Sequence, residues 1–294
     1  MTAEEFEARI VAWARGRTDV EALVLAGSRG GQVGRVDGWS DWDFHLICRQ
    51  PARYQGTDWL AGISPVWCAH AETTPRGVIK VSAVFENGFE VDFVPLAAWQ
   101  MKLVYWAMGH PDWAGRMPRR LRQGVVETRT FLLGSGFRLL LGDRGWERRL
   151  GRLAVPWPEY PMEAAVFLSH CASFWQKSVW VSKKIARPEP RSAMHWLHRL
   201  VTEHVYALLA EEARQSGRPA RSEARKAEAW LDGRRLEQTA MATSVDQQVL
   251  SRAFLAQIAL FEEVSQSVAR SRGFVLPDYQ PVAGWLRSEM SRLA

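Results

Sequence analysis

The sequence predicts an α+β protein, with an N-terminal domain of mixed α and β structure and an all-helical second domain. In the first half, short apolar runs end at Gly- and Asn-containing turns, which is typical of strands. In the second half, apolar residues recur every three or four positions over long segments, which is typical of amphipathic helices. A proline-containing connector at positions 156, 158 and 161 separates these patterns. The predicted domains are therefore residues 1–153 and 154–294.

The first half begins with a predicted helix over residues 3–14, where Phe6, Ile10 and Trp13 recur at helical spacing. The apolar run Ala22–Ala26 predicts a buried strand that ends at a Gly-Ser turn. Asn87-Gly88 between two apolar runs predicts a hairpin. The other elements predicted here are strands at 43–48, 64–70, 78–85, 89–94 and 137–141, and helices at 56–61 and 97–108.

The second half is predicted to consist of helices only. Phe167, Cys171, Phe174, Val181 and Ile185 share one face of a single helix. Further helices are predicted at 193–213, 222–231, 245–271 and 282–292.

Composition and charge exclude several classes of protein. The chain has 294 residues, of which 47% are hydrophobic and 24% charged, so it is expected to be globular rather than disordered. The net charge of +6 is small and spread along the chain, which disfavours a nucleic-acid partner. No apolar run approaches the ~20 residues of a membrane span. Three distant cysteines and an acidic N-terminal segment fit a cytoplasmic protein without a signal peptide.

Carboxylates gather on two of the predicted strands. Asp41 and Asp43 lie two residues apart at the start of one strand, so both point to the same side if extended. Glu90 and Asp92 alternate with apolar residues in a later strand. An Asp in such a strand needs a partner, and a set of carboxylate oxygens suits magnesium. Two such ions can hold the attacking and leaving oxygens of an in-line displacement.

The turn Gly27-Ser28-Arg29 precedes these carboxylates. Its backbone N–H groups and hydroxyl can bind phosphate oxygens, and Arg29 can add a charged contact. Taken singly, each motif is more typical of an ordinary turn, cap or edge strand than of a functional site. A strand, a Gly-Ser turn, Asp-x-Asp at the next strand and a third Asp after a hairpin together form a more specific combination.

These motifs carry a family resemblance. Residues 26–29, 39–44 and 85–93 resemble the aminoglycoside 6-adenylyltransferase (streptomycin adenylyltransferase-like) family of the DNA polymerase β-like nucleotidyltransferase superfamily. Weaker similarity extends over residues 137–143, 174–187 and 260–277, so the resemblance covers nearly the whole chain. Trp42 stands where the family commonly has Tyr, and Lys184 where it has Gly. Trp42 is expected to face away from the metals.

The resemblance implies a nucleotidyltransferase domain, with a mixed sheet flanked by helices, and a helical substrate-binding domain. It implies magnesium-dependent transfer of AMP from ATP to a hydroxyl of a small molecule, most of all an aminoglycoside such as streptomycin. Asp41 and Asp43 would hold two Mg²⁺ ions, and Asp92 would complete the catalytic metal site and help deprotonate the acceptor. Gly27, Ser28 and Arg29 would bind the nucleotide phosphates; the expected partners are a nucleoside triphosphate and a small hydroxylated acceptor.

Other interpretations stay open. Lys183 either reaches the triphosphate or belongs to the solvated face of its helix. The alternatives are the same chemistry directed at a protein, a nucleic acid or another metabolite, and a catalytically silent nucleotide-binding module. A polycationic acceptor calls for an acidic site, whereas the helical half is net basic. A monomer is expected. The candidate bases in this half are Glu163, Glu189 and Glu203, while His170, His195 and His198 are interpreted as packed or surface histidines.

Overall fold

The computed structural model divides into two compact units, Met1–Glu159 and Tyr160–Ala294. The residues that it describes are 1–31, 40–74, 77–118, 121–122, 124–126, 128–129, 132, 136–154, 161–218, 220, 224, 226–241 and 244–293. Each unit is described by itself below.

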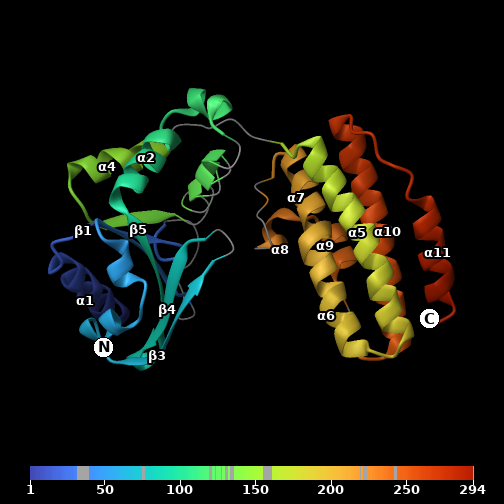
Figure 1. Cartoon of the computed structure of the whole chain (residues 1–294), viewed down its shortest axis with the longest axis horizontal. Coiled ribbons are helices and arrows are strands. Elements are labelled where there is room, and N and C mark those ends of the chain that lie inside the picture. The colour runs from blue at the N-terminus through green and yellow to red at the C-terminus, as the bar shows by residue number, and fades with distance from the viewer. Residues whose placement is uncertain are drawn as a thin grey trace. The chain divides into compact units, whose positions relative to one another are not determined.

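A mixed β-sheet forms the centre of the first unit (Figure 1). Its strands are β1 (Val20–Ala26), β2 (Trp42–Cys48), β3 (Val66–Thr73), β4 (Ile79–Phe85), β5 (Phe89–Ala97) and β6 (Phe137–Leu141). Their order in the sheet is β3-β4-β5-β2-β1-β6. The central pair β2 and β5 is parallel, whereas the other neighbouring pairs are antiparallel.

Helices cover both faces of this sheet (Figure 1). On one face, α1 (Ala3–Arg15) buries Phe6 and Ile10 against the odd-numbered side chains of β1 and the even-numbered side chains of β2, such as Leu23 and Phe44. On the other face, α2 (Ala98–Met108) and α4 (Arg144–Gly151) pack against the alternate side chains of β1. The period of two along each strand therefore separates two cores.

Turn and cap residues fix the ends of these elements. Thr2 forms a capping box with Glu5 at the start of α1. The predicted hairpin is present, because Asn87 and Gly88 have positive φ values of 68° and 76° between the antiparallel strands β4 and β5. Helix α4 was not predicted from its polar sequence; its start is set by Asp143, whose carboxylate accepts the N–H groups of Gly145 and Trp146.

Short 3₁₀ turns complete this unit. They are η1 (Pro51–Tyr54), η2 (Asp58–Gly62), η3 (Glu86–Gly88), η4 (Pro111–Arg116) and η5 (Arg152–Ala154). The short helix predicted at 56–61 corresponds to η2. Most of the segment between the Gly-Ser turn and β2, residues 32–39, lies outside the described residues.

The second unit is helical throughout its regular structure. Its elements are α5 (Ala164–Ala186), α6 (Pro190–Leu200), the π-helix η6 (Val201–Val205), α7 (Tyr206–Gln215), α8 (Ala227–Trp230), α9 (Gly233–Thr239), α10 (Gln247–Arg272) and α11 (Gln280–Ser291). Helices α5 and α10 pack through Phe174 and Phe261, whose ring centroids lie 3.6 Å apart. The predicted α+β fold with a helical second half is confirmed.

Two helix predictions in this unit need correction. The single helix predicted at 193–213 is interrupted by η6, where the Tyr206 N–H donates to the Val201 carbonyl five residues back. Of the helix predicted at 222–231, α8 covers only Ala227–Trp230, and part of the remainder lies outside the described residues. None of the helices described is long and apolar enough to cross a membrane.

Candidate functional site

The parallel pairing of β2 and β5 places two predicted site residues side by side. Asp43 and Asp92 are register partners, so they project from neighbouring strands on the same face of the sheet. The next residues along the two strands, Phe44 and Phe93, point to the opposite face, where their rings stack with their centroids 5.3 Å apart. Asp41 immediately precedes β2, two residues before Asp43. The structure therefore places Asp43 beside Asp92, with Asp41 directly before the start of β2.

Asp92 is held by two side chains of the neighbouring strand β4. The Ser82 hydroxyl donates to Asp92 Oδ1 at 2.5 Å, and the Lys80 ammonium donates to Oδ2 at 3.1 Å. Lys80 also pairs with Glu72 of β3 at 3.3 Å. Burial by itself would lower the pKa of Lys80, but the hydrogen bonds and charges of Asp92 and Glu72 outweigh it and raise that pKa. Lys80 is therefore a cation bound directly to the third carboxylate.

Sequence reasoning missed Lys80 and Ser82. The available signal is their alternation with Val81 and Ala83, which puts both polar residues on one face of β4. That they meet Asp92 follows from the antiparallel register that pairs Ser82 with Asp92, which the sequence does not reveal.

The Gly27 turn lies directly against Asp43. Ala26, the last residue of β1, is the register partner of Asp43. Gly27 has a φ of 74°, and a Cβ on it would lie 2.2 Å from Asp43 Oδ2. Only glycine adopts this positive φ readily and leaves room for a carboxylate oxygen where a Cβ would otherwise lie. The Gly30 N–H closes the turn by donating to the Gly27 carbonyl at 3.1 Å, and the Ser28 side chain is half-buried beside it.

Arg29 contacts the other side of β2. Its Nε donates to the Ser40 carbonyl at 2.7 Å, and its guanidinium carbon lies 3.7 Å from the centroid of the Trp42 ring. Trp42 is buried in the core beneath α1, on the face opposite Asp43, as its place between two aspartates predicts. These contacts fix the entry to β2. A phosphate contact for Arg29 stays a prediction.

The remaining predicted site residue lies in the helical unit. Lys183 is exposed on α5, whereas the other six predicted site residues belong to the sheet unit. Of the candidate bases, Glu163 precedes α5, Glu189 is bonded to Lys184 at 2.6 Å, and Glu203 is bonded to Lys177 at 2.6 Å. The role of Lys183 stays a prediction.

The donor set of the sheet site suits magnesium in its chemistry. Asp41, Asp43 and Asp92 offer carboxylate oxygens, which are the ligands that this ion prefers. Among the described residues, no group of three or more His, Cys, Asp or Glu side chains is placed so that it could hold a metal ion. Magnesium does not require one, because it keeps several waters and takes phosphate oxygens of its substrate. A cation at Asp92 must, however, share that carboxylate with Lys80.

Comparisons with known proteins give low similarity. No family model matches the chain, and no curated protein matches it. Among solved structures, an aminoglycoside 6-adenyltransferase from Bacillus subtilis is 13% identical, with a TM-score of 0.42, over 98% of each chain. A nucleotidyltransferase-like protein from Exiguobacterium sibiricum is 12% identical, with a TM-score of 0.36, over 99% of this chain and 89% of that one. Similarity at this level does not identify an activity.

Proposed function

We propose that this protein is a magnesium-dependent nucleotidyltransferase that moves AMP from ATP to a hydroxyl group of a small molecule. The observation that carries the proposal is the pairing of Asp43 with Asp92 on neighbouring parallel strands, with the Gly27 turn pressed against Asp43. A turn able to bind phosphate thus adjoins carboxylates able to bind cations. That combination is what transfer from a nucleoside triphosphate requires.

Each residue has a distinct task in the proposed reaction. The backbone N–H groups of the Gly27 turn and the Ser28 hydroxyl bind the triphosphate, with Arg29 and Lys183 as further phosphate contacts. Asp41 and Asp43 hold the metal-bound nucleotide, and Asp92 accepts the proton of the attacking hydroxyl. Magnesium, when bound, supplies positive charge that stabilises the phosphate oxygens in the transition state.

The proposed transfer balances as follows. The acceptor oxygen forms a bond to the α-phosphorus, and the bond from that phosphorus to the bridging oxygen of the β-phosphate breaks. The bond's electron pair leaves with pyrophosphate. Ser82 and Lys80 fix the orientation of the Asp92 carboxylate through the hydrogen bonds described above. Most of the rate enhancement then comes from positioning and charge neutralisation.

The acceptor class is part of this proposal. The family resemblance favours an aminoglycoside such as streptomycin, bound with the help of the helical unit. Other hydroxylated metabolites, proteins and nucleic acids are alternative acceptors for the same chemistry. These alternatives are separated by experiment.

The test is pyrophosphate release by the purified protein with ATP and magnesium, across aminoglycosides and other hydroxylated compounds. We expect an acceptor-dependent signal that is lost in Asp92→Ala and retained in the control Asp112→Asn, which removes an exposed carboxylate of η4. Silence across the panel with magnesium-dependent ATP binding intact would overturn the aminoglycoside assignment. Absence of any nucleotide binding would overturn the transferase itself.

A further inference from the structure

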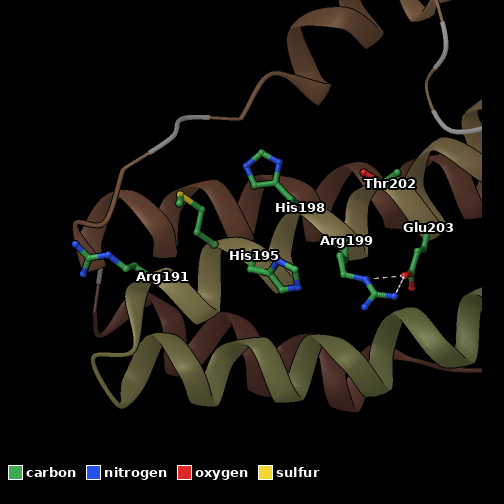
Figure 2. A pocket seen from close by; sticks show the side chains of 7 residues that line it. Arg191, His195, His198, Arg199, Thr202 and Glu203 are labelled. Carbon is green, nitrogen blue, oxygen red and sulfur yellow. Dashed lines mark hydrogen bonds and ion pairs between the residues drawn. The ribbon is translucent and has the colours of Figure 1, made fainter. Parts of the chain in front are cut away.

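A second candidate site lies on the helical unit. Side chains from successive turns of α6 and from η6 line a pocket of about 480 Å³ (Figure 2). Its described lining residues, here named the α6 pocket, are Arg191, Met194, His195, His198, Arg199, Thr202 and Glu203. This volume lies within the range of about 300–1,000 Å³ that is common for small-molecule sites.

The α6 pocket is rich in hydrogen-bond donors and poor in acceptors. Arg191 and Arg199 each carry a guanidinium, His195 and His198 each offer a ring N–H, and Thr202 offers a hydroxyl. Arg191 has no carboxylate partner among the residues that the structure describes. Guanidinium groups are common phosphate ligands, because they combine a positive charge with several N–H donors.

The lone carboxylate among the described lining residues is already neutralised. Both oxygens of Glu203 are bonded to cations: Oε1 accepts from Arg199 Nε at 2.9 Å and Oε2 accepts from Lys177 Nζ at 2.6 Å. Figure 2 shows Arg199 reaching toward Glu203 along the pocket wall. The hydrogen bond from Lys177, together with Arg199, lowers the pKa of Glu203 despite partial burial. Glu203 therefore leaves no free negative charge for a cationic ligand.

Glu203 belongs to the π-helix η6, and its partner Arg199 lies four residues earlier in the chain. In the five-residue turn Val201–Val205, Glu203 faces Lys177 of α5 while His204 is buried behind it. A π-turn inserted between two α-helices re-aims side chains, and such turns are frequent at functional sites. The glutamate thereby holds Arg199 in place, so that one guanidinium of the pocket is preorganised.

We propose that the α6 pocket binds a phosphate group. The cations Arg191 and Arg199 supply the attraction, and His195, His198 and Thr202 supply further donors. The same charges repel a polycation such as streptomycin from this pocket. If the proposed nucleotidyl transfer holds, on which this extension rests, the phosphate belongs either to the nucleotide or to a phosphorylated acceptor.

The direct test uses inorganic pyrophosphate as the probe and the full chain labelled at its histidines. NMR follows the His195 and His198 imidazoles, whose signals are assigned from His195→Gln and His198→Gln. We expect saturable shifts of both signals without magnesium. The variant Arg191→Gln/His198→Gln, followed through His195, is expected to bind about fivefold more weakly or worse, since the exposed cation Arg191 contributes up to about fivefold and His198 contributes a further ring N–H. The control Arg270→Gln removes an exposed arginine of α10 and should bind like the unmodified chain.

Two further titrations separate the sources of the phosphate. Shifts with ATP but not with a hexose monophosphate would assign the phosphate to the nucleotide. Shifts with a hexose monophosphate but not with ATP would assign it to a separate phosphorylated acceptor. Either result supports the pocket as a phosphate site.

Three results would overturn the proposal. They are the absence of any shift at millimolar pyrophosphate, equal binding by Arg191→Gln/His198→Gln and Arg270→Gln, and shifts of the same imidazoles by streptomycin in place of pyrophosphate. Since pyrophosphate binding is measured without ATP, magnesium or turnover, its outcome is independent of whether the transferase reaction is observed.

Discussion

Replacing Gly27 by alanine tests the arrangement of the turn and Asp43. The substitution lowers stability in two separate ways. The backbone of residue 27 must keep a φ of 74°, and the new Cβ would lie 2.2 Å from Asp43 Oδ2 and 3.2 Å from Asp43 Cγ. The first penalty is one of backbone conformation, and the second forces the Asp43 carboxylate to move.

The size of each penalty follows from these positions. A left-handed conformation costs a residue with a Cβ about 1–2 kcal/mol. Turning the Asp43 side chain away from its preferred rotamer adds roughly 0.5–1.5 kcal/mol. Gly27→Ala is therefore expected to destabilise the sheet unit by about 1.5–3.5 kcal/mol. A reacting group displaced by about 1 Å costs on the order of 100-fold in turnover, so activity should fall far more than stability.

Gly88→Ala is the matched control. Gly88 has a φ of 76°, and a Cβ there would have nothing within 4 Å. This variant has the backbone penalty alone, so it should lose about 1–2 kcal/mol of stability and keep its activity. Hydrogen exchange of the β1 and β2 amides measures the stability of the sheet unit by itself. Pyrophosphate release measures turnover.

Two results would contradict the role assigned to Gly27 and Asp43. If Gly27→Ala and Gly88→Ala lose the same stability and keep the same turnover, the approach of Gly27 to Asp43 has no functional meaning. A Gly27→Ala variant that binds magnesium-ATP like the unmodified chain would refute the placement of Asp43 in the site.

Two further predictions concern single side chains, Lys80 and His204. Lys80→Met removes the ammonium that competes with magnesium for Asp92, so titration calorimetry should show tighter magnesium binding. Its free energy of unfolding, measured by denaturation, should fall by about 0.5–1 kcal/mol. The control Lys102→Met breaks the ion pair with Glu21 and should leave magnesium affinity unchanged. Burial, followed by the charge of Lys177 and of its neighbour His170, lowers the pKa of His204 to about 4, while Glu203 acts in the opposite direction. Because only the unfolded chain then takes up this proton between about pH 6.5 and 4, stability should fall by about 1.4 kcal/mol per pH unit as the pH drops through that window. His204→Gln should flatten urea-derived stability over this range, and an unchanged slope would contradict the assignment.

Local patterns were sufficient to predict most elements of the sheet unit. The alternation in β5 and the positive-φ turn Asn87-Gly88 are written in neighbouring residues, so they can be read before any tertiary contact is known. Helix α4 was not predicted because its apolar side chains are few and its start depends on one capping carboxylate. The π-turn η6 escaped because its flanking sequence is compatible with a continuous helix, and packing against α5 is a non-local property.

Local sequence patterns were sufficient to identify the candidate site residues. These are Asp43 and Asp92 within predicted strands, Asp41 two residues before Asp43, and the Gly-Ser turn that precedes them. Which side chains lie next to each of them depends on tertiary packing. The register of β2 with β5 and of β4 with β5 brought Asp43 beside Asp92 and placed Lys80 on its carboxylate. Strand register depends on packing between distant segments, and a shift by one residue would turn each of these side chains to the opposite face.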